Sequence, residues 1–461
     1  MIWTPEQLSK ALSVAFKSKD KFGKVHFNSG HIHPGDIFIA LTGGKGDGHE
    51  FVNNAFARGA GLAIVSKDVK NAPLEKIIKV KDTLEALHDL AEYKRQSSKA
   101  KFIGITGSVG KTSTKEIVSL MLESFGKTFT SRNNFNNQLG VPLNLASIAD
   151  NDEYVVIEMA MRREGEIRHL TNMVTPDIAV VTSVAQGHLE FFDSVEGIAD
   201  AKSEIFEGLD INNGIAVLNR DMSTYKRCME NIDTVGVGNI RTFGKSQYAN
   251  IRFASYSLEP HGTVRLGFVI DSEKIEFEMP AIPRHMAINF AAGLAVIKAL
   301  GLDIHQAVKA LAHFKLKMSR GKIVDIKKDN KEYSIITDYY NANPESMQAG
   351  LEYLGQMNNN KKVAILGDMK ELGKDEVKIH LAAIPYIVKS GVKKLFLVGD
   401  IMTQIADDVP ASIEVHSYNN SIDLAQNINK YIEGGEFILI KGSRSIHLEK
   451  VAESLGVENA L

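Results

Sequence analysis

The sequence predicts an α/β protein with three domains. At 461 residues the chain exceeds one ordinary hydrophobic core, so about three domains are expected. Short apolar runs alternate with helical patterns over most of its length, which is typical of parallel sheets with crossover helices. A glycine-rich loop at 107–112 stands between such a run and a helical stretch. We place the domains at 1–97, 98–314 and 315–461.

The region 1–97 has the pattern of a small α/β unit. Buried-strand patterns occur at 37–41 and 62–65. A glycine-rich turn at 43–48 lies between them and leads into a helical stretch that ends near Gly59. The polar stretch 94–99 would link this unit to the next domain.

The two later regions each predict a sheet covered by helices. Strands are expected in the central region at 102–106, 154–159, 178–182 and 215–218. An alanine-rich stretch at 286–300 predicts a helix packed on that sheet. Strands are expected in the third region at 333–337, 363–366, 394–398 and 437–440, with helices at 344–354 and 377–390. This alternation predicts a doubly wound α/β domain.

Composition excludes several classes of partner. Hydrophobic residues make up 44% of the chain, and the 54 basic residues nearly balance the 56 acidic ones. We therefore expect neither a nucleic-acid-binding nor a membrane-binding surface. The first residues lack a basic stretch followed by an apolar one, and no apolar run approaches the ~20 residues that cross a bilayer. The single cysteine, Cys228, excludes an internal disulfide and suits a reducing compartment, so we expect a cytoplasmic protein.

The loop Gly107-Ser108-Val109-Gly110-Lys111-Thr112 predicts a phosphate-binding site. A strand, a glycine turn and a helix N-terminus in that order present backbone N–H groups to an anion. Lys111 would reach the β- and γ-phosphates of a nucleotide, and the Thr112 hydroxyl suits Mg²⁺. The usual pattern has another glycine where this chain has Ile105, so the loop is a shortened variant. An ordinary turn is the less favoured interpretation, and the loop alone leaves kinase, GTPase, ATPase and ligase open.

Polar residues at predicted strand ends are the next candidates, because open α/β sheets bind ligands at that edge. Glu158 ends one strand and could hold Mg²⁺, although a solvated strand end has the same pattern. His188 follows the next strand, and Lys202 lies in a helical stretch at 195–209. Taken alone, each of these two is more often a solvated surface residue.

Two asparagine-rich segments are candidates for substrate recognition. Asn134, Asn136 and Asn137 form a cluster whose side chains donate and accept, which fits amide or sugar groups. The segment Asp338-Tyr339-Tyr340-Asn341-Ala342-Asn343-Pro344 follows a predicted strand of the third region. A plain loop and a helix start, respectively, are the alternatives.

Several of these motifs occur together in one order, and the chain resembles the Mur ligase family of peptidoglycan synthesis. The matching segments are Thr106-Gly107-Ser108-Val109-Gly110-Lys111-Thr112, Asn134-Phe135-Asn136-Asn137 with Gly140-Val141-Pro142, Glu158-Met159, His188-Leu189-Glu190, Ala201-Lys202-Ser203-Glu204-Ile205-Phe206 and Asn219-Arg220-Asp221. The resemblance spans all three predicted domains, and the ordered set is far more specific than any one motif.

Within the family, the chain is most similar to the member that joins D-alanyl-D-alanine to UDP-N-acetylmuramoyl-tripeptide. The segments that indicate this member are 338–344, Leu366-Gly367-Asp368-Met369, Glu371-Leu372-Gly373, Lys441-Gly442-Ser443-Arg444 and, near the N-terminus, 34–41 with 47–51. The resemblance implies a UDP-muramyl-peptide-binding first domain, an ATPase-like central domain and a Rossmann-like ligase domain that closes over the site. It implies an ATP-dependent ligation through an acyl phosphate, giving the pentapeptide precursor, ADP and phosphate. A monomer would suit such closure.

The resemblance also assigns roles to single residues. It implies four catalytic residues, which are Lys111, Glu158, His188 and Lys202. The implied Mg²⁺ ligands are Thr112, Glu158, His188 and Lys202, with Lys202 carbamylated by CO₂. The implied ATP contacts are Gly107, Ser108, Val109, Gly110, Lys111, Thr112, His285, Asn289, Arg320 and Asp338. The implied substrate contacts are Ser29, Asn134, Asn136, Asn137, Asn341 and Asn343.

The chain departs from the family pattern at a few positions. Asn28-Ser29-Gly30 stands where Asp-Ser-Arg is usual, Pro283-Arg284-His285-Met286 replaces Gly-Arg-His-Asn, Asn133 replaces a common glycine, and His447 a common arginine. Two alternatives stay open: another amide ligase of the superfamily, such as a different Mur enzyme or a folylpolyglutamate synthetase, and a nucleotide-binding regulator without activity. The sequence does not indicate whether the tripeptide ends in meso-diaminopimelate or L-lysine.

Overall fold

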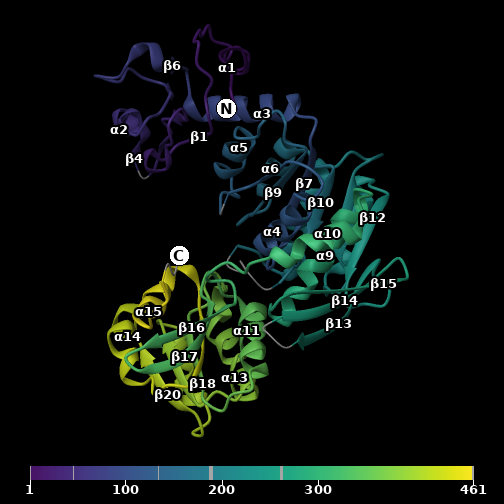
Figure 1. Cartoon of the computed structure of the whole chain (residues 1–461), viewed down its shortest axis with the longest axis vertical. Coiled ribbons are helices and arrows are strands. Elements are labelled where there is room, and N and C mark those ends of the chain that lie inside the picture. The colour runs from purple at the N-terminus through teal and green to yellow at the C-terminus, as the bar shows by residue number, and fades with distance from the viewer. Residues whose placement is uncertain (1, 45, 133, 186–190, 260–262, 459–461) are drawn as a thin grey trace.

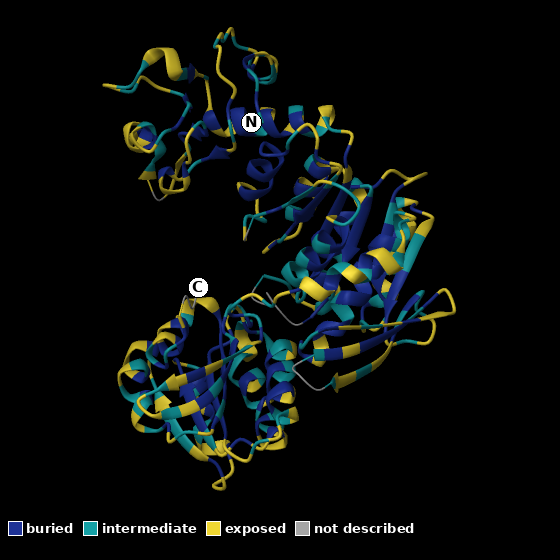
Figure 2. Cartoon of the chain, in the orientation of Figure 1, coloured by how far each residue is buried: buried dark blue, intermediate teal, exposed yellow. Residues whose placement is uncertain are grey.

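The computed structural model describes residues 2–44, 46–132, 134–185, 191–259 and 263–458. These residues form three lobes in chain order, each built around its own β-sheet, and the lobes follow one another along an open arc (Figure 1). Figure 2 shows the buried residues concentrated in the sheets and on the helix faces turned toward them. The predicted α/β class with three domains is confirmed, while the residue boundaries of the domains stay a prediction.

The N-terminal lobe holds a parallel sheet of four strands in the order β1-β2-β5-β6. The strands are β1 (Val25–His26), β2 (Ile37–Ile39), β5 (Leu62–Val65) and β6 (Ile77–Lys79), and the helices are α1 (Pro5–Leu12), α2 (Val52–Ala57) and α3 (Thr83–Ser97). The glycine-rich turn contains a short hairpin of β3 (Thr42–Gly43) and β4 (Gly46–Asp47). Asp82 begins α3 by accepting hydrogen bonds from the backbone N–H groups of Leu84 and Glu85.

The central lobe holds nine strands in the order β15-β14-β13-β12-β11-β10-β7-β9-β8. They are β7 (Lys101–Thr106), β8 (Thr128–Thr130), β9 (Tyr154–Glu158), β10 (Ile178–Val181), β11 (Ile215–Asn219), β12 (Asn239–Gly244), β13 (Ile251–Glu259), β14 (Thr263–Ile270) and β15 (Glu273–Pro280). The strands from β8 to β13 pair in parallel, as expected. The prediction of a parallel sheet missed the antiparallel edge formed by β13, β14 and β15. This edge has one solvated face, so its strands lack the continuous apolar runs of the buried strands.

Helices cover both faces of the central sheet. One face packs against α4 (Lys111–Leu122), α9 (Ala287–Ala299) and α10 (Ile304–Ala310), and the other against α5 (Gly140–Leu145), α6 (Glu166–Val174), α7 (Val195–Ser203) and α8 (Tyr225–Val235). The predicted helix at 286–300 is confirmed as α9. None of the helices among the described residues is long and apolar enough to span a bilayer.

The C-terminal lobe holds six strands in the order β16-β17-β21-β18-β19-β20, parallel except for the β16–β17 pair. The strands are β16 (Lys322–Lys328), β17 (Lys331–Asp338), β18 (Lys362–Gly367), β19 (Lys394–Val398), β20 (Glu414–Tyr418) and β21 (Phe437–Lys441). The helices are α11 (Pro344–Gln356), α12 (Glu376–Leu381), α13 (Ile384–Ser390), α14 (Ser421–Asn427) and α15 (Glu449–Ser454). The single helix predicted at 377–390 is wrong, because α12 ends at Leu381 and α13 begins anew with Pro385 in its first turn. Proline lacks the N–H that a continuous helix would need there.

Candidate active site

The phosphate loop leaves the carboxyl end of β7, between β9 on one side and β10 on the other. Chain segments diverge to opposite sides of β7 at this point, which is where open α/β sheets form their binding crevice. Both loop glycines have positive φ angles, 151° at Gly107 and 87° at Gly110. A Cβ at Gly107 would stand 2.0 Å from Thr182 Oγ1, and one at Gly110 would stand 2.5 Å from Asn289 Oδ1. Only glycine fits either position.

The loop is held by the segment that follows β10. Ser183 Oγ accepts from the Val109 N–H at 2.8 Å, and Thr182 Oγ1 donates to the Val109 carbonyl at 2.6 Å. Ser108 Oγ accepts from the backbone N–H of Ala185 at 3.0 Å. These contacts fix the backbone ahead of α4, so the N–H groups at the helix start need no rearrangement to meet an anion.

Lys111 and Thr112 open α4 as the motif predicts. Lys111 Nζ donates to the carbonyl oxygens of Gly107 at 2.6 Å and Ser108 at 3.3 Å, so the ammonium lies over its own loop. Burial lowers the pKa of Lys111, and the nearby Glu158 carboxylate acts in the opposite direction. The Thr112 hydroxyl accepts from Arg320 Nη2 at 3.3 Å. A residue beyond the central lobe therefore contacts the phosphate loop directly.

Glu158 ends β9, whose last pair in the sheet register is Glu158 with Ile105 of β7. Its side chain is 2% exposed, and Oε1 accepts from Asn136 Nδ2 at 2.8 Å. Among the described residues Oε2 has no hydrogen-bond donor. A buried carboxylate oxygen without a donor fits a hard cation, which takes oxygen ligands. Glu158 Oε2 and the Thr112 hydroxyl are both oxygen donors of the kind that Mg²⁺ prefers.

Lys202 lies on α7 and is 1% exposed. Burial holds its pKa well below the usual value, and the positive charge of Lys111 lowers it further. No hydrogen bond or ion pair joins its ammonium to another described residue. Both effects favour the neutral amine over the ammonium form. His188, the remaining member of the predicted catalytic set, lies outside the described residues.

The side chains of the asparagine cluster make different contacts. Asn136 contacts Glu158, whereas Asn137 Oδ1 accepts from the backbone N–H groups of Leu139 and Gly140 and so holds the turn ahead of α5. Asn134 is exposed. The structure therefore brings one of the three predicted substrate contacts directly against the candidate metal carboxylate.

On the C-terminal lobe, Asp338 ends β17 and pairs with a buried lysine. Lys441 Nζ, on the neighbouring β21, lies 2.8 Å from Asp338 Oδ2 and also donates to the Asn341 carbonyl at 3.3 Å. Asn343 Oδ1 accepts from the Ser346 N–H at 2.9 Å, which begins α11. The Asn343 side chain thus serves as a helix cap in this structure, while Asn341 is exposed.

Arg320 and Tyr340 bring this lobe to the phosphate loop. The Arg320 guanidinium lies over the Tyr340 ring with 3.9 Å between Cζ and the ring centroid, while its Nη2 reaches Thr112. Asn289, near the start of α9, lies beside Gly110, and His285 lies exposed in the turn that precedes α9. Ser29 is buried in the N-terminal lobe, within the turn that follows β1.

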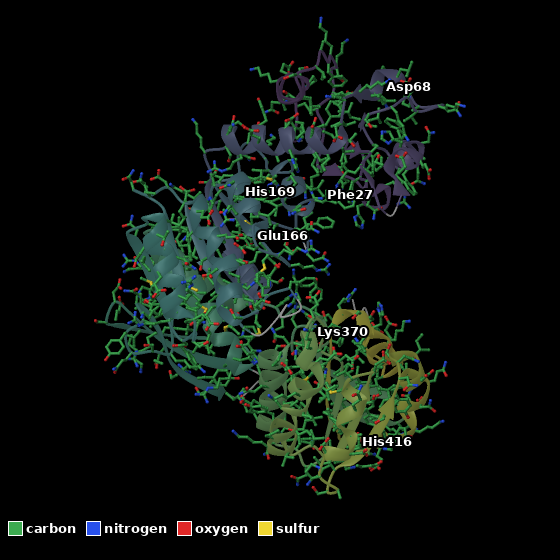
Figure 3. The ribbon with its side chains drawn as sticks, turned by 180° about the vertical axis from the view of Figure 1, so that it is seen from behind. Phe27, Asp68, Glu166, His169, Lys370 and His416 are labelled. Carbon is green, nitrogen blue, oxygen red and sulfur yellow. The ribbon has the colours of Figure 1, made fainter. Side chains whose placement is uncertain are left out.

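The segment Asp368-Met369-Lys370 is held rigidly at the carboxyl end of β18. Asp368 is fully buried; its Oδ1 accepts from the N–H groups of Ile401 and Met402, and its Oδ2 pairs with Lys370 Nζ at 2.8 Å. Lys370 lies on the side of the C-terminal lobe that is turned toward the other two lobes (Figure 3). The motif therefore forms a well-held loop on the side of the C-terminal lobe that faces the other two lobes.

Several residues of the site were not among the predicted ones. Lys115 is fully buried beside Glu158, Ser131 contacts both of them, and Lys441 pairs with Asp338. Only Lys115 carried a local signal, because it stands four residues after Lys111 and so on the same face of a helix. The other two depend on chain segments that come together only in the fold.

Comparisons with known proteins cover all three lobes. The family model described as Mur ligase middle domain matches residues 105–297, that described as Mur ligase, glutamate ligase domain matches 323–444, and that described as Mur ligase family, catalytic domain matches 22–95. The UDP-N-acetylmuramoyl-tripeptide–D-alanyl-D-alanine ligase of Rickettsia prowazekii is 41% identical over 98% of this chain and 99% of its own. Among solved structures, MurF from Acinetobacter baumannii has a TM-score of 0.83 at 27% identity, covering 99% of both chains. MurF ligase from Thermotoga maritima in complex with ADP has a TM-score of 0.76 at 27% identity, covering 94% of this chain and 97% of its own. The chain belongs to the Mur ligase family.

Proposed function

We propose that this chain joins D-alanyl-D-alanine to UDP-N-acetylmuramoyl-tripeptide at the expense of ATP. The near full-length similarity to the Rickettsia prowazekii ligase carries the substrate assignment. The phosphate loop supports the ATP chemistry, with Glu158 at the end of the neighbouring strand and the buried Lys202 close enough to be affected by the charge of Lys111. Mur ligases are ATP-dependent enzymes that form a C–N bond, and the products here are the UDP-muramoyl-pentapeptide, ADP and phosphate.

The first step is attack by the terminal carboxylate of the tripeptide on the γ-phosphorus of ATP. The bond to ADP breaks, and an acyl phosphate forms. Lys111 and the backbone N–H groups of the loop stabilise the negative charge that builds on the phosphoryl oxygens. Mg²⁺ held by Thr112 and Glu158 would add positive charge at the same place. In the second step the amine of D-alanyl-D-alanine attacks the acyl carbon, phosphate leaves, and the amine proton is released.

We further propose that Lys202 carries a carbamate when the enzyme is active. The uncharged amine attacks CO₂, a C–N bond forms, and one proton is released, which turns a cationic side chain into an anionic oxygen donor suited to Mg²⁺. The burial of Lys202 and its strongly lowered pKa support this, because only the neutral amine is nucleophilic. His188 is proposed to share that metal site.

The remaining assignments follow the three lobes. We place the UDP-muramyl-peptide site in residues 1–97, with Ser29, and the ATP site in 98–314, with His285 and Asn289 on its adenine side. Residues 315–461 would form the ligase domain that closes on them, with Arg320 and Asp338 reaching the nucleotide and Asn341 and Asn343 the substrate. Closure excludes water, which would otherwise hydrolyse the acyl phosphate. We expect the enzyme to act as a cytoplasmic monomer.

The test is phosphate release by the full chain with ATP, Mg²⁺ and UDP-muramoyl-tripeptide, with and without D-alanyl-D-alanine. Comparing tripeptides that end in meso-diaminopimelate and in L-lysine identifies the preferred tripeptide substrate. Single amino acids and a folyl substrate with L-glutamate serve as controls for the related ligases. Release that requires the dipeptide is expected. Nucleotide binding without release on any muramyl peptide would indicate a regulator instead and contradict the proposal.

A further inference from the structure

Lys115 is a buried lysine one helical turn beyond Lys111, and the proposed chemistry does not use it. Its side chain is 0% exposed. Its Nζ donates to the Ser131 carbonyl at 2.8 Å and lies 3.5 Å from Glu116 Oε1 and 3.7 Å from Glu158 Oε2. A buried ammonium is costly unless it is paired and hydrogen-bonded, and both conditions are met here. Such an arrangement is expensive to keep in a core that could hold an apolar side chain instead.

The contacts of Lys115 converge on the candidate metal ligand. Ser131 joins the two residues: its carbonyl accepts from Lys115, and its hydroxyl accepts from the Glu158 N–H at 3.0 Å. Asn136 fixes Glu158 Oε1 from the other side. The remaining oxygen, Oε2, is too far from Lys115 for a hydrogen bond but close enough to be attracted by its charge. Glu158 is therefore held in one orientation while Oε2 keeps its lone pairs available.

We propose that Lys115 is a positioning residue that holds Glu158 in the orientation in which its Oε2 binds Mg²⁺. The inference rests on the proposed role of Glu158 in metal binding. Lys111 and Lys115 lie on the same face of α4 but have different tasks: the first faces the phosphate loop, the second the carboxylate.

Glu116 links Lys115 to the segment that leads into the C-terminal lobe. Glu116 Oε1, which lies beside Lys115, also accepts from Lys317 Nζ at 2.6 Å. Lys317 stands between the last helical turn of the central lobe, Leu311–His313, and β16. The charges alternate from Lys317 through Glu116 and Lys115 to Glu158. Removing Glu116 or Lys317 should therefore weaken the positioning of the Glu158 carboxylate, as removing Lys115 does, but to a smaller extent.

The experiment measures how Mg²⁺ promotes binding of a non-hydrolysable ATP analogue to the full chain by calorimetry. For Lys115→Met the Mg²⁺ concentration at half-saturation should rise about 10–100-fold, as is typical when the residue that orients a metal ligand is lost. Analogue binding without Mg²⁺ should stay unchanged. Glu116→Gln, in which Lys115 is retained, should give a smaller rise and serves if Lys115→Met does not fold.

Lys94→Met is the matched control, since Lys94 is also a buried lysine but contacts Asp150 and Trp3 at another junction. Its Mg²⁺ dependence should equal that of the parent. Glu158→Gln is the reference for the metal site. If Glu158→Gln has no effect on the Mg²⁺ dependence, the proposed metal role of Glu158 fails. If Glu158→Gln shifts it but Lys115→Met and Glu116→Gln do not, only the positioning role is wrong. Equal loss of binding with and without Mg²⁺ in Lys115→Met would show a merely structural role and also overturn the inference.

Discussion

The N-terminal and central lobes share a buried apolar cluster, whereas the described residues form no buried apolar cluster that the central and C-terminal lobes share; hydrogen bonds and ion pairs join these two lobes. At the first, Trp3 is 0% exposed and its indole N–H donates to the Ala146 carbonyl at 2.8 Å. Leu143 and Ala146 of the central lobe belong to the same buried cluster as the core of the N-terminal lobe. Lys94 lies over the Trp3 ring, 4.6 Å from Nζ to the ring centroid.

The second junction has a different character among the described residues. Arg162 Nη2 lies 3.4 Å from Glu371 Oε1, and Arg320 reaches Thr112. The buried residues of the two apolar clusters in the C-terminal lobe begin at Ile326, so these clusters take no buried residue from the central lobe. Figure 1 shows the C-terminal lobe separated from the N-terminal lobe along the arc.

The difference determines which lobes can move. Separating the first junction would expose apolar side chains to water, at about 25 cal/mol for each Å². The polar groups of the second junction exchange their partners for water at little cost, since exposed ion pairs contribute about 0–1 kcal/mol. The N-terminal and central lobes should therefore move as one body, with the C-terminal lobe hinged on them. The proposed catalytic residues therefore lie near the junction that we expect to open, and we expect the other junction to contribute more to stability.

The largest expected effect separates activity from stability. Lys111→Ala should abolish ligation, because the loop loses the charge that neutralises the phosphates. The free energy of unfolding should stay close to that of the parent, since Lys111 is not part of the apolar junction. Phosphate release and urea unfolding of the same preparation check both expectations. Near-normal turnover would contradict the assignment of the loop.

At the other junction the expected result is reversed. Trp3→Ala should lower the free energy of unfolding by about 3–5 kcal/mol, the usual cost of removing a buried aromatic side chain. The folded fraction should still turn over substrate, because no contact of Trp3 reaches the phosphate loop. Denaturant unfolding followed by activity per folded molecule is the measurement. If the free energy of unfolding fell only as much as it does when an exposed residue is replaced, the junction between the N-terminal and central lobes would not be the stabilising one.

Acid should weaken the first junction through Asp150. Partial burial raises the pKa of Asp150, but hydrogen bonds from Lys94 and Gln7 outweigh it, so the pKa lies below its usual value. A depressed pKa means that the stabilisation is fully present above the pKa of an unfolded aspartate, roughly 3.9, and is lost as the pH falls through the lower folded value. The free energies of unfolding of the parent and of Asp150→Asn should converge in that range. Curves that run parallel through it would contradict the role of the pair.

The smallest effect on stability is expected at the second junction. Arg162→Ala removes an ion pair whose arginine side chain is 71% exposed, so the free energy of unfolding should change by less than about 0.5 kcal/mol. Small-angle scattering should instead show a broader distribution of lobe arrangements, and high salt should have the same effect on the parent. A substantial loss of stability would mean that this junction is fixed rather than hinged.

Much of the fold could be predicted because its strands, loops and helices follow from local sequence patterns. The strand, glycine loop and helix around 107–112 form β7, the phosphate loop and α4 as expected, and Glu158 stands at the edge of the same sheet. The antiparallel edge at β13–β15 and the break between α12 and α13 were missed. A half-solvated strand has a weak apolar pattern, and an apolar helical pattern can continue across a break that a proline imposes.

The sequence by itself determined the α/β class and the phosphate loop, because strand, helix and loop patterns depend on neighbours within a few residues. The order of the family motifs can be read directly along the chain. Only the tertiary structure decided which side chains hold the predicted ones in place. Lys441 meets Asp338 across 103 residues, and Lys94 meets Asp150 across 56. It also decided that Asn343 caps α11 and that Asn137 holds the turn ahead of α5, while Asn136 contacts Glu158. A buried lysine has no periodicity that identifies its partner; the partner is set by which strands and helices pack together.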